Sequence, residues 1–404
     1  MRRRDFLKLT AVMAAGSLSW RLWAAPTGGS QTRCLVVFLR GAYDSLNALV
    51  PYADDFYYQS RPNIALPRPD KKDPQAVIAL DARWGMAASL QDDLHPLYAA
   101  KQLAFVPFAG TGFVSRSHFQ AQDWVEFGQP ATARPNSDSG FLNRLLRELG
   151  AGTAPRPEAV SFTQTLPPIL TGTMPVANSP ISLPRSRQLT PHFEQLVLQM
   201  YTGHALEQQV SDGLGLRKAI ASELVEEMQA ASRDATAPGG FALEAGRIGR
   251  LLRERPELSV GFIDVGGWDT HAAQGGASGA LSTRLQALSA GLAELETSLG
   301  NGWNNTVVMV LSEFGRTFRE NGSRGTDHGH GTAMWVLGGS ISGGRIVGEQ
   351  ADLAPGKLHQ DRDLPVLNEY RAVLGGLFRH MYGLNPAQLA RIFPSSTPAD
   401  LGLL

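Results

Sequence analysis

Carboxylates and imidazoles crowd into one short part of the chain. Residues 312–330, SEFGRTFRENGSRGTDHGH, carry five side chains able to do chemistry: Glu313, Arg316, Asp327, His328 and His330. Carboxylate oxygen and imidazole nitrogen are standard ligands for divalent ions. This segment therefore predicts a metal site. The competing interpretation of DHGHG is a polar turn with solvated histidines.

A second motif, DTH, lies earlier in the chain. Asp269 and His271 stand two residues apart, so in an extended loop both side chains point to the same side. Alternatively, Asp269 or Thr270 caps a helix that follows. The Gly266-Gly267 pair and the strand-like run before it favour the metal role.

Three apolar runs predict the strands that position these residues. Cys34–Leu39 precedes Asp44, Ser259–Ile263 precedes the DTH motif, and Thr306–Leu311 precedes Glu313. Open α/β sheets place their chemistry just beyond the carboxyl ends of the strands. The three runs therefore predict one shared site at one edge of a sheet.

A serine-containing loop supplies candidate nucleophiles. Ser115 and Ser117 occur in SRSH, and a hydroxyl becomes a useful nucleophile when a metal or a base lowers its pKa. The alternative is that these serines cap a helix beginning near Phe119. Arg316 could hold an oxyanion such as phosphate or sulfate through two hydrogen bonds, or form an ion pair with Glu313 that shapes the loop.

Composition restricts the class of protein. The 404 residues include 37 basic and 37 acidic side chains, a balance that argues against a general binder of nucleic acid or another polyanion. Cys34 is the only cysteine, so neither an intramolecular disulfide nor a cysteine-based zinc site is available. The length suits one large α/β domain or two smaller ones.

The first 25 residues are predicted to be a twin-arginine export signal. RRRDFLK at residues 2–8 precedes a mostly apolar stretch over 9–20, and AAP at 24–26 supplies small residues for cleavage. The expected location is therefore periplasmic or secreted. An uncleaved anchor and a basic amphipathic helix are the alternatives. The apolar stretch is shorter than the roughly 20 residues of a spanning helix, and nothing later is long enough.

Alternating strands and helices predict a mainly parallel sheet covered on both faces. Further strands are expected over 102–108 and 333–337, and helices over 141–149 and 370–382. Leucines at steps of four and three over 281–299 predict a helix packed on the sheet rather than a coiled coil. Residues 26–404 would form the mature domain, with a partly helical insertion or cap around 130–255.

Four motifs in order resemble the DUF1501 family of exported bacterial proteins. They are RGAYDSLNALVPY, SRSHFQAQDW, GGWDTH, and SEFGRT followed by TDHGHG. The family is placed by similarity within the alkaline phosphatase and sulfatase superfamily. That superfamily hydrolyses phosphate or sulfate esters with metal ions and an active-site nucleophile. The resemblance implies an alkaline-phosphatase-like three-layer α/β sandwich.

The resemblance also implies roles for individual residues. Asp44 would bind metal after the first strand, Ser117 or Ser115 would be the nucleophile, and the DTH motif would supply two ligands. In the superfamily a late strand ends in Asp-His, whereas here it ends in Glu313-Phe314. Either Glu313 replaces the usual acid and DHGH supplies the remaining histidines, or DHGH is itself the shifted Asp-His pair.

The sequence thus predicts an exported, metal-dependent hydrolase of phosphate or sulfate esters. The candidate metal ligands are Asp44, Asp269, His271, Glu313, Asp327, His328 and His330. Zinc suits the histidine-rich position, and manganese, calcium or magnesium suits a carboxylate-rich one. The alternative is a non-catalytic envelope protein with a structural metal, serving a partner or a polysaccharide pathway. A closed metal site would favour this alternative, and an open ligand position would favour catalysis.

Overall fold

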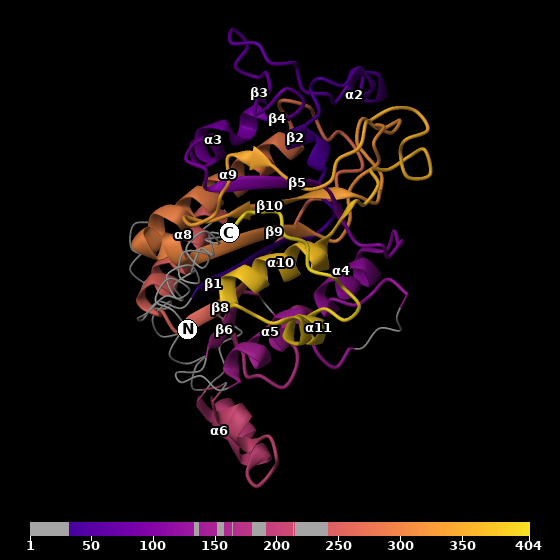
Figure 1. Cartoon of the computed structure of the whole chain (residues 1–404). Coiled ribbons are helices and arrows are strands. Elements are labelled where there is room, and N and C mark those ends of the chain that lie inside the picture. Colours follow the sequence, from indigo (N-terminus) through magenta and orange to yellow (C-terminus); the bar gives the residue numbers. More distant parts are fainter. Residues whose placement is uncertain are drawn as a thin grey trace, which may run out of the picture. The chain divides into compact units, whose positions relative to one another are not determined.

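A central β-sheet organises the chain (Figure 1). This computed structural model describes residues 32–132, 137–151, 157–163, 165–179, 191–212, 214 and 241–404, so the expected export signal lies outside the described residues. The strands of the sheet are β1 (Arg33–Leu39), β5 (Leu103–Gly110), β6 (Glu158–Ser161), β7 (Ala177–Asn178), β8 (Leu258–Val265), β9 (Thr306–Ser312), β10 (Thr332–Leu337), β11 (Arg345–Ile346) and β12 (Asn368–Glu369).

The sheet is mainly parallel, as the sequence predicts. Its order is β11-β5-β10-β9-β1-β8-β6-β7, with β12 also paired to β5. Among the described strands of this sheet, only β10 runs antiparallel to its neighbours, β5 and β9. Phe38 of β1 lies opposite Asp264 of β8 and Leu311 of β9. The carboxyl ends of these three strands therefore meet at one edge of the sheet.

The side chains of β1 divide the interior into two cores, because successive residues of a strand point to opposite faces. Leu35, Val37 and Leu39 belong to one core. Cys34, Val36 and Phe38 belong to the other. Both faces of β1 are buried, which explains why its sequence from Cys34 to Leu39 is uninterruptedly apolar.

Helices cover both faces and complete a three-layer α/β sandwich (Figure 1). On the Leu35 side are α3 (Gln91–Ala99), α8 (Phe241–Glu254) and α9 (Ala280–Leu299). On the Phe38 side are α4 (His118–Phe127), α5 (Phe141–Gly150), α10 (Tyr370–Tyr382) and α11 (Pro386–Ile392). The leucines of α9 share a core with β1, so this helix packs on the sheet as expected.

Part of the interval 130–255 belongs to the sandwich itself. Strands β6 and β7 extend the central sheet, α5 joins the Phe38-side core, and α8 packs along α9. The helix α6 (Pro191–Tyr201) also lies in this interval, whereas residues 180–190 and 215–240 lie outside the described part. A cap formed by the remainder of the interval stays a prediction.

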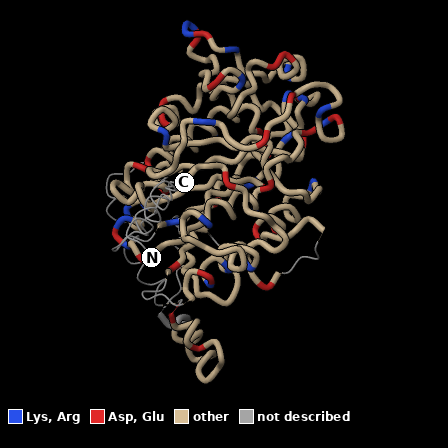
Figure 2. The backbone as a smooth tube through the Cα atoms, in the orientation of Figure 1, with Lys and Arg blue, Asp and Glu red and all other residues tan. Residues whose placement is uncertain are grey.

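Short elements follow β1. They are the helix α2 (Asp55–Ser60) and a three-stranded sheet in the order β2 (Leu49–Val50), β4 (Gly85–Met86) and β3 (Ile78–Ala79). Acidic and basic residues are interspersed along the chain (Figure 2). Among the described residues, no helix has the length and apolar character needed to cross a membrane.

Candidate metal centre

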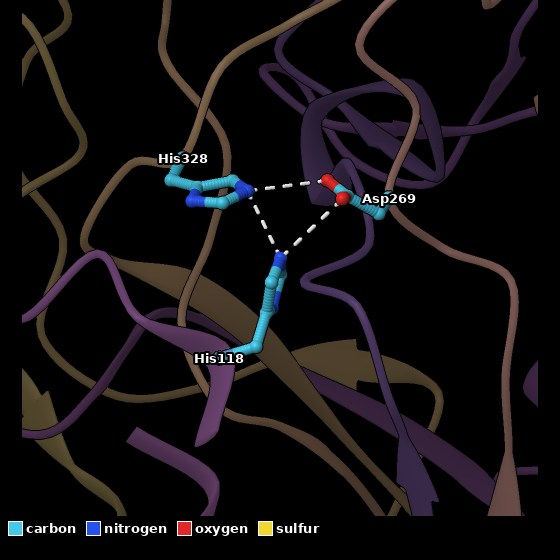
Figure 3. Close-up of side chains that lie close together, drawn as sticks. All are labelled: His118, Asp269 and His328. Atoms are coloured by element: carbon cyan, nitrogen blue, oxygen red, sulfur yellow. Dashed lines mark hydrogen bonds and ion pairs between the residues drawn. The ribbon is translucent and has the colours of Figure 1, made fainter. Parts of the chain in front are cut away.

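Side chains from three separate loops converge beyond the carboxyl edge of the sheet (Figure 3). His118 is the first residue of α4, Asp269 follows β8, and His328 lies between β9 and β10. One ligand atom from each of the three lies within 4.8 Å of the other two. His271 adjoins this group through His328 and Asp269. These four residues are called the His/Asp cluster below.

The distances within the His/Asp cluster are short. The Nε2 atom of His328 lies 2.9 Å from Nε2 of His118 and 3.0 Å from Nε2 of His271. Oδ1 of Asp269 lies 2.9 Å from Nε2 of His271 and 3.2 Å from Nε2 of His328. Its Oδ2 lies 3.5 Å from Nε2 of His118. Imidazole nitrogens of His118 and His328 and the carboxylate of Asp269 therefore face a common point, and His271 adjoins this group through His328 and Asp269.

Hydrogen bonds on the far side of two rings fix which nitrogen faces the cluster. Nδ1 of His118 lies 2.7 Å from Oε1 of Glu313, and Nδ1 of His328 lies 2.7 Å from the carbonyl oxygen of Arg116. A carbonyl or an ionised carboxylate only accepts hydrogen bonds, so each Nδ1 carries the hydrogen. In the neutral rings both Nε2 lone pairs consequently point into the cluster.

The third ring is held in the same way, less tightly. Nδ1 of His271 lies 3.3 Å from Oδ1 of Asp327, and the side-chain amide of Asn321 donates to the same oxygen over 2.9 Å. The Asn321 amide also donates to the carbonyl oxygen of His271. The hydrogen bond from Asn321 lowers the pKa of Asp327, so this acceptor stays ionised.

This donor set fits a divalent cation. Lone pairs directed at one another repel, and a cation between them converts the repulsion into coordination. Tetrahedral zinc with Zn–N bonds of 2.0–2.1 Å separates its ligand atoms by about 3.3 Å. The separations of 2.9–3.2 Å around Nε2 of His328 come close to that value. An Nδ1 anchored to an oxygen acceptor is also typical of metal-binding histidines.

Arg316 is paired with Asp269 and is not open to solvent. Its Nη1 donates to Oδ1 of Asp269 over 2.6 Å, its Nε donates to Oγ1 of Thr326 over 3.2 Å, and its Nη2 donates to the Thr326 carbonyl. Burial acts to raise the pKa of Asp269, but the hydrogen bond and charge of Arg316 outweigh it and leave that pKa lowered. Arg316 therefore orients a cluster carboxylate, and its ion-pair partner is Asp269 rather than Glu313.

Glu313 lies behind His118 and does not face the cluster centre. Its Oε1 accepts hydrogen bonds from the Gly41 backbone over 2.8 Å and from Gln122 over 2.9 Å. Burial acts to raise the pKa of Glu313, but these bonds and the one from His118 outweigh it and lower that pKa. The same carboxylate raises the pKa of His118, which makes that ring a more basic ligand.

The structure does not bring Asp44 or His330 into the cluster. Both carboxylate oxygens of Asp44 bond the guanidinium of Arg61, at 2.5 and 3.1 Å, and Gln274 donates to one of them over 2.6 Å. The His330 ring packs against the His359 ring at 4.5 Å between centroids. Burial lowers the pKa of His330 to about 4, so this ring is neutral near pH 7. Asp44 therefore has a structural partner in place of the predicted metal.

The two candidate nucleophiles lie at the start of α4. Ser117 is the N-cap of α4, and its side chain accepts a hydrogen bond from the Gln120 backbone. The Ser115 hydroxyl donates to Oε1 of Gln120 over 2.9 Å. Within the described residues, neither hydroxyl bonds a cluster side chain. The capping interpretation is confirmed for Ser117, and nucleophilic use of either serine stays a prediction.

His118 and Gln122 are the site residues that sequence reasoning did not select. Both occur in SRSHFQAQDW, just beyond β5, which pairs with β10 as β9 does. The carboxyl end of β5 therefore lies at the same edge of the sheet as the other strand ends. The loop after β5 also begins at this edge, and recognising that from the sequence could have identified His118 as a site residue.

The cluster is open on one side. The side chains of Asp269, His271 and Asp327 are 43, 45 and 53% exposed, whereas those of Glu313 and Arg316 are 0% exposed. Buried partners hold the inner side and solvent reaches the outer side. A water molecule or a substrate oxygen can approach from that outer side.

Replacing Asp44 by Asn is expected to destabilise the fold without removing metal. The buried Arg61 guanidinium would lose its charge partner, which costs about 3 kcal/mol in the free energy of unfolding. Urea unfolding measures this loss, and elemental mass spectrometry measures the metal. Asp55→Asn, which breaks an exposed ion pair, is the control and should change stability little. A folded Asp44→Asn protein without metal would instead identify Asp44 as a ligand.

Replacing Glu313 by Gln is expected to weaken metal binding about tenfold while the protein stays folded. The amide fills the same volume, but it lacks the charge that makes the His118 ring basic. Competition with a chelating dye measures the affinity. Glu254→Gln alters an exposed carboxylate and should have no effect. An unchanged affinity in Glu313→Gln would show that Glu313 does not support His118.

Among the solved structures similar to this chain are two with low sequence identity. The lipoteichoic acid synthase LtaP from Listeria monocytogenes has 8% identity and a TM-score of 0.38, with 93% of this chain and 77% of LtaP covered. Ps i-CgsB in complex with k-i-k-neocarrahexaose has 9% identity and a TM-score of 0.37, with 92% and 75% covered. No curated protein matches the chain in sequence.

The family comparison covers most of the chain. The family model described as "Protein of unknown function (DUF1501)" matches residues 31–393, which include every strand of the central sheet and the whole His/Asp cluster. The protein therefore belongs to the DUF1501 family.

Proposed function

We propose that the protein is an exported, metal-dependent hydrolase of phosphate or sulfate esters. The observation that carries the proposal is the convergence of two imidazole Nε2 atoms, of His118 and His328, with the carboxylate of Asp269, while a third imidazole, of His271, adjoins two of them. Each ring is anchored through Nδ1 to an oxygen acceptor, so the ligand atoms are oriented before any ion binds. Such preorganisation is expected of a metal centre.

His118, His328 and Asp269 would hold the ion, with His271 beside them. A histidine-rich set favours zinc, and manganese is the next candidate because one ligand is a carboxylate. When bound, the ion supplies positive charge at the ester oxygens and lowers the pKa of a hydroxyl or water beside it. The exposed side of Asp269 and His271 supports an open position and therefore catalysis rather than a purely structural site.

The chain's own residues would perform the hydrolysis as follows. The hydroxyl of Ser117 or Ser115 attacks phosphorus or sulfur, the bond to the alcohol oxygen breaks, and the alcohol leaves with a proton. Water then cleaves the serine ester and releases phosphate or sulfate. Ser117 supports this role because it directly precedes the ligand His118. The four motifs resemble the DUF1501 family, and the placement of that family by similarity within the alkaline phosphatase and sulfatase superfamily supports the same chemistry.

Export is part of the proposal. The paired arginines of RRRDFLK, the apolar stretch after them and the small residues at 24–26 support the twin-arginine route. That route transports folded proteins, so the metal centre would form before export. Fusion of residues 1–30 to a reporter, with and without Arg3→Lys/Arg4→Lys, tests this part of the proposal separately.

The first experiment is the metal content of the purified protein. We expect about one zinc or manganese per chain in the wild type and less than about a tenth of that in His328→Ala, because the central ligand is removed. Elemental mass spectrometry measures both. His204→Ala removes an exposed histidine outside the cluster and should retain the metal. A wild type that contains no divalent ion, and is not stabilised by adding one, would refute the hydrolase.

The second experiment tests the serine. We expect Ser115→Ala/Ser117→Asn to lose at least about 1000-fold in hydrolysis of 4-nitrophenyl phosphate or sulfate, because Asn preserves the helix cap but offers no hydroxyl. The metal content should not change. Undiminished hydrolysis in this variant would exclude both serines. A metal-loaded wild type inactive on all esters would favour the non-catalytic envelope protein.

A further inference from the structure

The loop between β5 and α4 presents three exposed side chains beside the His/Asp cluster. Val114 is 56% exposed, Phe119 is 83% exposed, and Arg116 is exposed between the two serines. The same loop ends in the ligand His118. These exposed side chains therefore lie within a few residues of a cluster ligand.

Arg116 is anchored to the cluster through its backbone while its side chain is available. Its carbonyl oxygen accepts the hydrogen bond from Nδ1 of His328 at 2.7 Å. Among the described residues, its guanidinium makes no hydrogen bond or ion pair. Burial raises the pKa of Asp363, and the charges of Arg362 and Arg116 partly offset that rise, so the positive charge of Arg116 acts in this region without a direct ion pair among the described residues.

Arg316 does not reach an incoming anion as arranged, because its side chain is 0% exposed and its three guanidinium nitrogens donate to Asp269 or Thr326. Freeing it would leave Asp269 without its partner. A guanidinium binds the oxygens of phosphate or sulfate through charge-assisted hydrogen bonds. Arg116 is the arginine next to a cluster ligand whose donors remain free for this purpose.

Phe119 extends the same surface with an apolar ring. It directly follows His118, so their Cα atoms are about 3.8 Å apart. Phe113 of the same loop covers its ring by stacking on Trp124, at 4.1 Å between centroids and 5° between planes. Phe119 has no such partner and is the most exposed large hydrophobic side chain of the described chain. An exposed aromatic ring beside a charged site is a platform for the ring of a ligand.

We propose that Arg116 and Phe119 form the substrate-recognition subsite of this centre. Arg116 would bind the anionic group of the ester, and Phe119 would stack on a ring in the alcohol that leaves. The inference rests on the proposed function and narrows it to anionic esters of ring-bearing alcohols. The positive charge of Arg116 matches the anionic group, and the exposed ring of Phe119 directly follows a cluster ligand.

The test compares phenylphosphonate with methylphosphonate as probes of the zinc-loaded, full-length protein. The two anions differ only in the ring, and titration calorimetry measures each Kd. In the wild type, phenylphosphonate should bind about fivefold tighter because of stacking. Arg116→Gln should weaken both probes at least about tenfold. Phe119→Ser should abolish the difference between them and leave the Kd of methylphosphonate unchanged.

Controls separate this subsite from the metal centre. Arg147→Gln removes an exposed arginine elsewhere and should change neither affinity. Zinc content is measured for every variant and should remain equal to that of the wild type. A wild type unable to hold zinc would refute the centre and the subsite together. Retained zinc with equal phosphonate affinities in wild type and Arg116→Gln would overturn the subsite alone, and so would equal binding of the two probes by the wild type.

Discussion

The candidate site depends on the register of three parallel strands. β1 lies between β9 and β8, and the carboxyl ends of all three stop at the same level. A shift of one residue would move β1 by about 3.3 Å and exchange the side chains that fill the two cores on its two faces. Both faces of β1 are buried, so either face would lose its packing. The hydrophobic effect that fixes this register therefore also fixes the distance between the loops that carry Asp269 and Glu313.

The backbone after β1 also passes very close to the loop after β8 at this edge of the sheet. Gly41, directly beyond β1, has φ of +116°, and a Cβ there would lie 2.8 Å from the backbone nitrogen of Asp269. The Gly41 N–H donates to Glu313, which in turn accepts from His118. Only glycine fits both the angle and the space. One glycine thus connects the first strand with the loop after β8 and with the support of a cluster ligand.

The sequence predicted the framework of the fold well, because apolar runs and leucine spacing indicate buried strands and helices within short segments of the chain. The five predicted strands, β1, β5, β8, β9 and β10, lie where those patterns place them, and so do α9 and α10. Partner choice was less predictable. Asp44 has the expected position after β1, but its carboxylate forms an ion pair with the buried Arg61, 17 residues later in the chain. His118 was overlooked because it starts a helix, and nothing local shows that its ring meets His328, 210 residues away.

The division between buried and exposed parts of the cluster argues for a site that acts on a ligand. A structural metal site surrounds its ion with protein ligands and gains stability by closing. Here the buried charges of Glu313 and Arg316 are fully paired and hold ligands from behind, while Asp269 and His271 remain nearly half exposed. Ordering and desolvating these charged groups costs free energy. The exposed side of the cluster has too little packing to offset that cost. A cluster whose buried side is held rigidly and whose other side is exposed to solvent is expected where a substrate or water molecule binds at the exposed side.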